Sequence, residues 1–166
     1  LGSAERLWLS GANGCGKTTL MKLIAGELTP REGEISYAPR LKIAYYRQDL
    51  KLLDPARTVS DYLLSSGQDE THFHNLMGCI GLKDSLAYEL IGSLSWGEKA
   101  KVQILGILLG DYNLLMLDEP TNHLDMRSRD MLADALQQYH GAVIFVSHDR
   151  AFIQKIATRE LCLMPQ

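Results

Sequence analysis

The stretch Gly11-Ala12-Asn13-Gly14-Cys15-Gly16-Lys17-Thr18 decides the fold of this chain. It matches the pattern G-x-x-x-x-G-K-[ST] of a phosphate-binding loop. The glycines allow a tight turn whose N–H groups point inward at phosphate oxygens. Residues 5–10 before the loop are expected to form a strand, and residues 19–25 after it an apolar helix. Strand, loop and helix in this order are the context that the motif requires, so the sequence predicts a nucleotide site and leaves the reaction open.

The loop also predicts how a nucleotide is held. Lys17 can contact the β- and γ-phosphate oxygens, the Thr18 hydroxyl can ligate Mg²⁺, and the following helix directs its positive N-terminal end at the phosphates. The residues expected to contact the nucleotide in this segment are Gly11, Asn13, Gly14, Cys15, Gly16, Lys17, Thr18 and Thr19. A chance glycine-rich turn is the alternative, and the flanking elements argue against it.

The bulk composition excludes several function classes. A chain of 166 residues with 46% hydrophobic and 22% charged residues is typical of one globular domain with a real core. A net charge of −3 argues against non-specific nucleic-acid binding. Cys15, Cys79 and Cys162 lack the spacing of a metal site, so we expect them to be small packing residues in a reducing cytoplasm. The sequence contains no apolar run of membrane-spanning length and no signal peptide, so direct membrane insertion is not expected.

Alternating strand and helix patterns predict an α/β fold. Strands are expected at 34–37, 41–46, 113–117, 142–146 and 160–163, and helices at 95–109, 127–139 and 151–156. Ser95 with Glu98 forms a capping-box pattern at the start of the helix at 95–109. We therefore predict a mainly parallel sheet with helices on both faces, in a domain spanning 4–166 with a small helical subdomain at about 55–95. Residues 1–3 contain the Gly-Ser pair typical of a cloning remnant.

Carboxylates follow the buried strand at 113–117. Asp118 and Glu119 come at the carboxyl end of this strand, the edge where functional groups gather in an open α/β sheet. Asp118 is placed to hold Mg²⁺, and Glu119 to polarise an attacking water. The alternative is a carboxylate pair that only starts a helix, and the upstream phosphate loop argues against it. Gln48 and His148 also follow strands. Gln48 could ligate Mg²⁺ or position water, although alone it is more often a polar loop residue. His148 could hydrogen-bond the γ-phosphate, although alone a histidine at a strand end is more often structural.

Several separated motifs together resemble the ATP-binding-cassette (ABC) superfamily. The segments that carry the likeness are 11–18 (Walker A), Gln48 (Q-loop), 94–98 with the sequence LSWGE (signature), 114–119 (Walker B), 124–125 (D-loop) and His148 (switch histidine). Their order and spacing agree over nearly the whole chain. The resemblance implies a P-loop NTPase fold and a Mg²⁺-dependent ATPase that binds ATP.

The resemblance also implies a catalytic role for the strand-end residues. Thr18, Gln48 and Asp118 would hold Mg²⁺ and the water. Glu119 would activate that water for attack on the γ-phosphate, and His148 would steady the γ-phosphate.

A second cassette is implied as a partner. Ser95 and Gly97 of one cassette would contact the γ-phosphate bound to the Walker A loop of the other, and Asp125 would act across the interface. ATP would close this head-to-tail sandwich and hydrolysis would open it.

Two segments narrow the resemblance to the ABC-F subfamily. They are 119–125 (EPTNHLD) and 146–152 (VSHDRAF). This subfamily implies cytoplasmic tandem-cassette ATPases that act on the ribosome as translation factors or as antibiotic-resistance proteins. The alternative within the superfamily is the ATPase subunit of a membrane transporter. Chromosome-maintenance and DNA-repair ATPases are disfavoured because Lys17 and Ser95 are too close in sequence for an intervening long coiled coil, and a binding module without hydrolysis is disfavoured by Glu119.

Three departures from the family pattern limit the resemblance. Trp96 stands where the signature usually has glycine, which adds bulk close to where the partner's γ-phosphate would dock. The family's adenine-stacking aromatic and antiparallel subdomain precede Walker A, so we expect this chain to lack both. We also expect a single cassette without the linker that contacts the ribosome. Weak activity of the isolated chain follows from these expectations.

Overall fold

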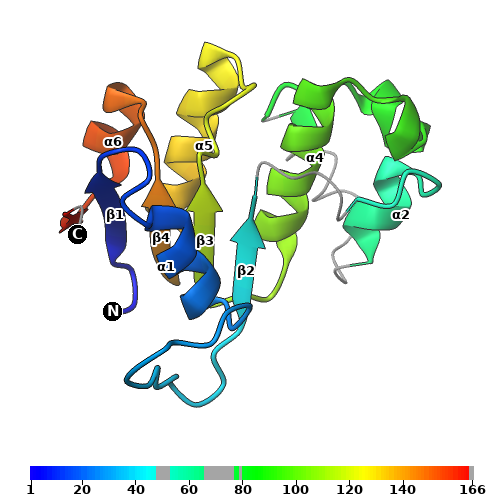
Figure 1. The fold of residues 1–166 in the computed structure, drawn as a ribbon. Coiled ribbons are helices and arrows are strands. Elements are labelled where there is room, and N and C mark those ends of the chain that lie inside the picture. The colour runs from blue at the N-terminus through cyan, green and yellow to red at the C-terminus, as the bar shows by residue number, and fades with distance from the viewer. Residues whose placement is uncertain (48–52, 66–76, 79, 165–166) are drawn as a thin grey trace.

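The computed structural model describes residues 1–47, 53–65, 77–78 and 80–164. Within these ranges, parallel strands form one sheet in the order β2-β3-β4-β1-β5, with helices on both faces (Figure 1). The strands are β1 (Arg6–Gly11), β2 (Ile43–Tyr46), β3 (Leu114–Asp118), β4 (Ala142–Val146) and β5 (Arg159–Leu163). The α-helices are α1 (Lys17–Ile24), α2 (Val59–Leu64), α4 (Trp96–Leu109), α5 (Met126–Gln138) and α6 (Arg150–Ile156). The predicted α/β class is confirmed.

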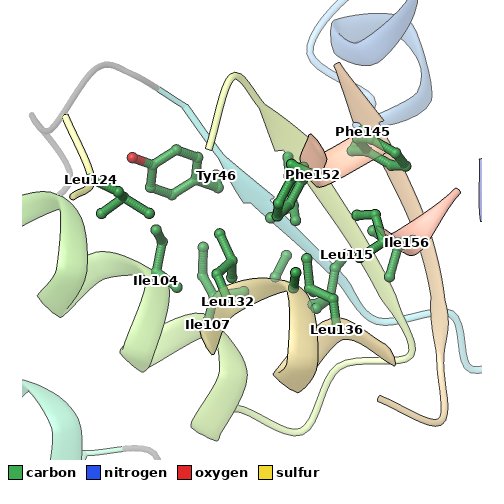
Figure 2. Close-up of a cluster of buried hydrophobic side chains, with 14 residues drawn as sticks. Tyr46, Ile104, Ile107, Leu115, Leu124, Leu132, Leu136, Phe145, Phe152 and Ile156 are labelled. Atoms are coloured by element: carbon green, nitrogen blue, oxygen red, sulfur yellow. The ribbon is translucent and has the colours of Figure 1, made fainter. Parts of the chain in front are cut away.

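Side chains along β3 and β4 alternate between two cores. Leu115, Leu117 and Phe145 point to the face covered by α4, α5 and α6, where they join the buried cluster drawn in Figure 2. Leu114 and Met116 point to the opposite face, which packs against α1. Successive residues of a strand point to opposite faces, so strands covered on both faces read as continuous apolar runs. The burial of both strands on both faces explains why the sequence pattern predicted them well.

Helix α4 is buried on two sides. Ile104 and Ile107 join the sheet-side cluster, while Val102 and Leu105 join a second cluster with residues of α2. Two 3₁₀ helices, Asp84–Tyr88 and Ile91–Ser93, also belong to this second part of the molecule. The predicted helical subdomain at about 55–95 falls partly outside the described residues, including its segment 66–76, and its boundaries stay a prediction.

Two predictions about local structure are wrong. Residues 34–37 form no strand, because they are almost entirely exposed and no neighbouring strand pairs with them. A strand persists in water only when a ladder of hydrogen bonds and a packed face support it. Cys162 is exposed on the edge strand β5 instead of being packed, and Cys79 lies outside the described residues. The other predicted strands and helices are present, with ends that differ by one or two residues.

The register of the sheet brings distant motifs together. Asp118 at the end of β3 pairs with Val146 at the end of β4, and β1, the next strand in the sheet, ends at Gly11. The carboxyl ends of parallel strands meet at one edge, and ligands of open α/β sheets bind outside this edge. The phosphate loop, the carboxylates after β3 and the residues after β4 therefore surround a common space.

Candidate active site

Residues 11–16 form the turn from β1 into α1. Gly11, Gly14 and Gly16 have φ angles of 137°, 81° and 100°, in the left-handed region that favours glycine. Space is also restricted at Gly11, where a Cβ would lie 2.7 Å from Cys15 Sγ. Gly16 caps α1 without a side chain, so the first N–H groups of this helix are not used by a side-chain cap. The turn has the backbone shape and the open donors that an anion site needs.

Lys17 is held at the mouth of this turn. Its Nζ donates hydrogen bonds to the carbonyl oxygens of Gly11 at 2.8 Å and Ala12 at 3.0 Å. These acceptors keep the ammonium group beside the open backbone donors, and together they form a positively polarised cradle. The arrangement can bind the phosphates of a nucleotide.

Thr18 and Asp118 connect two motifs that lie 100 residues apart in the chain. Thr18 Oγ1 donates a hydrogen bond to Asp118 Oδ2 at 3.0 Å. Tyr45 on β2 presents a buried hydroxyl with no hydrogen-bond partner among the described residues. Burial raises the pKa of Tyr45 well above its usual range, and the charge of Asp118 acts in the same direction. The Thr18 hydroxyl and the Asp118 carboxylate both line the cavity and provide the oxygen ligands that Mg²⁺ prefers, so these residues fit that ion.

Glu119 and His148 form the other wall. Glu119 Oε2 accepts the backbone N–H of His148 at 3.3 Å, and Glu119 Oε1 lies 3.2 Å from His148 Nε2. The Glu119 backbone has φ of 51°, in the left-handed region that residues other than glycine rarely adopt. Burial raises the pKa of Glu119, and the neighbouring His148 opposes part of this rise. A carboxylate whose pKa moves toward neutrality is a better general base at pH 7 than an ordinary one.

These groups line one cavity of about 530 Å³. Its lining consists of Asn13, Gly14, Gly16, Lys17, Thr18, Thr19, Asp118, Glu119, Val146 and His148. Gly11 and Cys15 belong to the same loop but not to this lining, and Gln48 lies outside the described residues. The fold thus gathers most of the predicted phosphate, metal and base residues around a single space.

The segment 94–98, called the signature segment below, lies away from this cavity and begins α4. The Ser95 hydroxyl donates to Glu98 Oε2 at 2.6 Å and accepts the Glu98 N–H at 3.3 Å, while the Ser95 N–H donates to Glu98 Oε2 at 2.9 Å. The predicted capping box is confirmed. These bonds from Ser95 also lower the pKa of Glu98.

Both carboxylate oxygens of Asp125 accept hydrogen bonds from residues of the same chain. Its Oδ1 accepts the Ser128 N–H at 2.9 Å, which caps α5, and its Oδ2 accepts from Lys101 Nζ at 2.8 Å and from Ser128 Oγ at 2.9 Å. The hydrogen bond from Lys101 is the main reason that the pKa of Asp125 lies well below its usual range. Ser95, Gly97 and Asp125 are therefore not brought to the phosphate cavity in this single chain.

Some neighbours of the site residues carry no clear sequence signal. Tyr45, whose pKa the charge of Asp118 helps to raise, has the sequence of an ordinary strand residue, and only the sheet order shows that β2 lies beside β3. Lys101 lies on α4, and its bond to Asp125 appears only after the two helices pack. A capping or strand-end pattern is local, whereas these contacts join segments far apart in the chain.

The described residues include neither a cluster typical of a metal site nor a membrane-spanning helix. Over the described ranges, no three His, Cys, Asp or Glu side chains cluster as a metal site. No helix in that part of the chain is long and apolar enough to cross a membrane.

Known proteins resemble this chain in sequence. A family model described as ABC transporter matches residues 1–122. The ABC transporter F family member 4 of Arabidopsis thaliana is 40% identical over 162 residues, and the ATP-binding protein Uup of Haemophilus influenzae is 38% identical over 160 residues. Each alignment covers 93% of this chain but only 22% and 25% of the respective relative. The chain therefore spans about a quarter of the length of these relatives.

A solved structure extends the comparison to the fold. The archaeal ribosome recycling factor aABCE1, in complex with the archaeal ribosomal stalk protein aP1, matches with a TM-score of 0.81 and 28% sequence identity. The match covers 98% of this chain and 32% of that chain.

Proposed function

The chain belongs to the ABC transporter family, and from this premise we propose that it is the ATP-binding and ATP-hydrolysing cassette of an ABC-F-type protein. The observation that carries the proposal is the cavity shared by Lys17, the Thr18–Asp118 pair and the Glu119–His148 pair. Phosphoryl transfer to water requires groups that bind the phosphates, ligands for the metal ion and a general base, and this cavity provides a candidate for each.

In this proposal the chain's own groups divide the work. Lys17 and the backbone donors of the phosphate loop bind the phosphate oxygens. The oxygens of Thr18 and Asp118 would hold Mg²⁺, together with Gln48. When bound, this ion neutralises charge on the phosphates and orients them for displacement.

Glu119 acts on the attacking water. Its carboxylate takes a proton from water as the water oxygen attacks the γ-phosphorus. The bond from the γ-phosphorus to the bridging oxygen breaks, so that ADP leaves, and the raised pKa of Glu119 suits the proton transfer. His148 holds the carboxylate through two contacts and stands exposed at the cavity rim, where its imidazole can steady the γ-phosphate. The proton and the phosphate are thus handled by adjacent side chains.

A second cassette completes the proposed site. Ser95, Gly97 and Asp125 lie away from the phosphate cavity of their own chain, which fits a head-to-tail sandwich in which they face the nucleotide of a partner. We expect the partner cassette in the same full-length protein, and we expect weak turnover by the chain alone. Robust turnover at low concentration of the isolated chain would contradict this expectation.

The ribosome is the proposed target of the full protein. Likeness to an F family member and to a ribosome recycling factor supports this assignment. ATP-driven closure would then control residence on a cytoplasmic ribosome, in translation or in antibiotic resistance. An ATPase subunit of a membrane transporter is the competing function.

Glu119→Gln in the full-length protein tests the hydrolysis. We expect phosphate release to fall by about 100-fold or more, because a general base contributes roughly this much, while ATP binding persists. The exposed Glu160→Gln on β5 is the matched control and should leave turnover unchanged. Normal turnover in Glu119→Gln would reject the assignment of the base.

Glu119→Gln also distinguishes action on the ribosome from action as a transporter subunit. A protein trapped with ATP should co-sediment with purified ribosomes, and the ATP-free protein should not. Capture of a membrane protein together with failure to sediment with ribosomes would favour the transporter.

A further inference from the structure

Trp96 makes an aromatic contact with the loop after β3. It is the first residue of α4, and 54% of its surface is exposed. Its ring centroid lies 6.2 Å from that of His123, with an interplanar angle of 78°. This edge-to-face geometry is the favourable arrangement of an aromatic pair. A glycine at position 96 has no ring and cannot make the contact.

Two more contacts join the same elements. The backbone approaches closely at Gly97, where a Cβ would lie 3.2 Å from the His123 carbonyl oxygen. One turn further along α4, the nearly buried Lys101 donates to Asp125 at 2.8 Å. The start of α4 is therefore attached to residues 123–125 by a ring contact, a close backbone approach and an ion pair.

The loop connects this contact to the catalytic carboxylate. The Asn122 N–H donates to the Glu119 carbonyl at 3.2 Å, and the Leu124 N–H donates to the Thr121 carbonyl at 3.3 Å. Glu119 and His123 both have left-handed φ angles, 51° and 65°. Two consecutive hydrogen-bonded turns with restricted backbone angles make this loop a short and stiff link.

The base of the link is fixed to the sheet. The Thr121 and Ser147 hydroxyls are both buried and lie 3.2 Å apart, so the loop is tied to the residue that precedes His148. Glu119 and His123 therefore both lie within two residues of one point of the loop that is anchored to the sheet.

We propose that Trp96 is a positioning residue that couples the first turn of α4, through His123, to Glu119 of the same cassette. The inference rests on the proposed ATP hydrolysis. Nucleotide at the phosphate cavity thereby sets the position of the signature segment, which would face the second cassette. The indole supplies an attachment that the usual glycine of the signature lacks.

A double-mutant cycle in the full-length protein tests the coupling. Trp96→Ala and His123→Ala should each lower kcat by roughly 3- to 10-fold, the size that an edge-to-face pair supplies, with KM for ATP changed by less than about twofold. The double variant should be no worse than either single variant. His123→Phe and Trp96→Phe keep both rings and should restore kcat. Tyr88→Ala removes another exposed aromatic and should have no effect.

Fluorescence gives a readout that does not require hydrolysis. The emission of Trp96, taken as the difference between the protein and its Trp96→Phe variant, should change on addition of ATP. His123→Ala should abolish this response and His123→Phe should retain it, whereas a purely structural contact would alter stability alone.

The outcomes separate the inference from the proposed function. The coupling would be overturned, even if the protein hydrolyses ATP, by either of two results. One is a fold loss of kcat in the double variant that equals the product of the two single losses. The other is an ATP response of Trp96 fluorescence that persists in His123→Ala. Absence of turnover in the unmodified protein would reject the hydrolysis, and an ATP response that depends on His123 would still support the coupling.

Discussion

Glu119 and Asp125 stand at the two ends of one short loop, and their surroundings are opposite. Glu119 is half-buried and burial raises its pKa, whereas the more exposed Asp125 accepts hydrogen bonds from Lys101 and Ser128 that lower its pKa. One end faces a cavity, and the other end caps a helix. The surroundings therefore destabilise the charged carboxylate of Glu119 and stabilise the charged carboxylate of Asp125.

The difference extends to the two sides of the molecule. On the phosphate-loop side, the Tyr45 hydroxyl has no partner among the described residues and α1 begins without a side-chain cap. On the signature side, Ser95 is bonded to Glu98 and Asp125 to its own helix. Around the phosphate loop, the first N–H groups of α1 are left for a ligand, whereas Ser95 and Asp125 on the signature side already have partners within the chain.

The largest expected effect concerns Lys17→Ala, which should damage activity and not folding. The hydrogen bonds of Lys17 among the described residues go to two loop carbonyls, so its removal costs little stability, but it removes the main positive charge of the phosphate cradle. We expect ATP turnover to fall by at least about 100-fold, measured as phosphate release, with an unchanged melting temperature. Lys22→Ala, on the last turn of the same helix, is the control and should retain turnover. A large loss of stability in Lys17→Ala would contradict the division between the two sides.

Local signals predicted much of this arrangement. The capping box at Ser95 depends on two residues three positions apart, so the sequence shows it directly. The glycines of the phosphate loop stand where the backbone has a positive φ, so they predict the turn. The strands β3 and β4 are apolar on both faces and were found within one residue of their observed ends. The edge of the sheet then followed from the rule that strand ends gather functional groups.

Contacts between distant segments were not predictable in the same way. The ring of His123 meets Trp96, and Lys101 meets Asp125, only because α4 packs beside the loop after β3. The error at 34–37 has the same origin, since a β-forming sequence needs a neighbouring strand that no local pattern specifies. Propensity predicts elements, and tertiary packing decides which of them persist and what they touch.

On the signature side, Asp125→Ala should chiefly reduce stability. It removes the cap of α5, worth about 1 kcal/mol, and leaves the nearly buried Lys101 ammonium without its acceptor, so a loss of about 2 kcal/mol in the free energy of unfolding is expected. Because the folded pKa of Asp125 is lowered, this stabilisation is present above its usual pKa and is lost as pH falls toward the folded value. Denaturant titrations at several pH values measure the difference.

The exposed Asp134→Ala on the same helix is the control for this variant. Asp134 pairs with Lys155 at the surface, so its loss should cost less than about 1 kcal/mol. A cost for Asp125→Ala no greater than that of Asp134→Ala would show that the signature side does not depend on this carboxylate.

The smallest expected effect has the opposite pH dependence. Because the folded pKa of Glu119 is raised, the folded state holds a proton that the unfolded chain releases, so Glu119 lowers stability as pH rises from its ordinary value of 4.5 through the folded pKa. Glu119→Gln removes this titration while its amide oxygen can still accept the His148 N–H. In thermal unfolding at pH 8, the variant should therefore have a higher melting temperature than the unmodified protein. This gap between the two melting temperatures should shrink as pH falls toward 4.5. Lys17, Asp118 and His148 face the same carboxylate, and the first and last of these oppose the rise, which keeps the gap small. Glu160→Gln should show no such trend. A gap that widened at low pH would contradict the raised pKa of Glu119 and would mean that folding lowers it, as it does for Asp125.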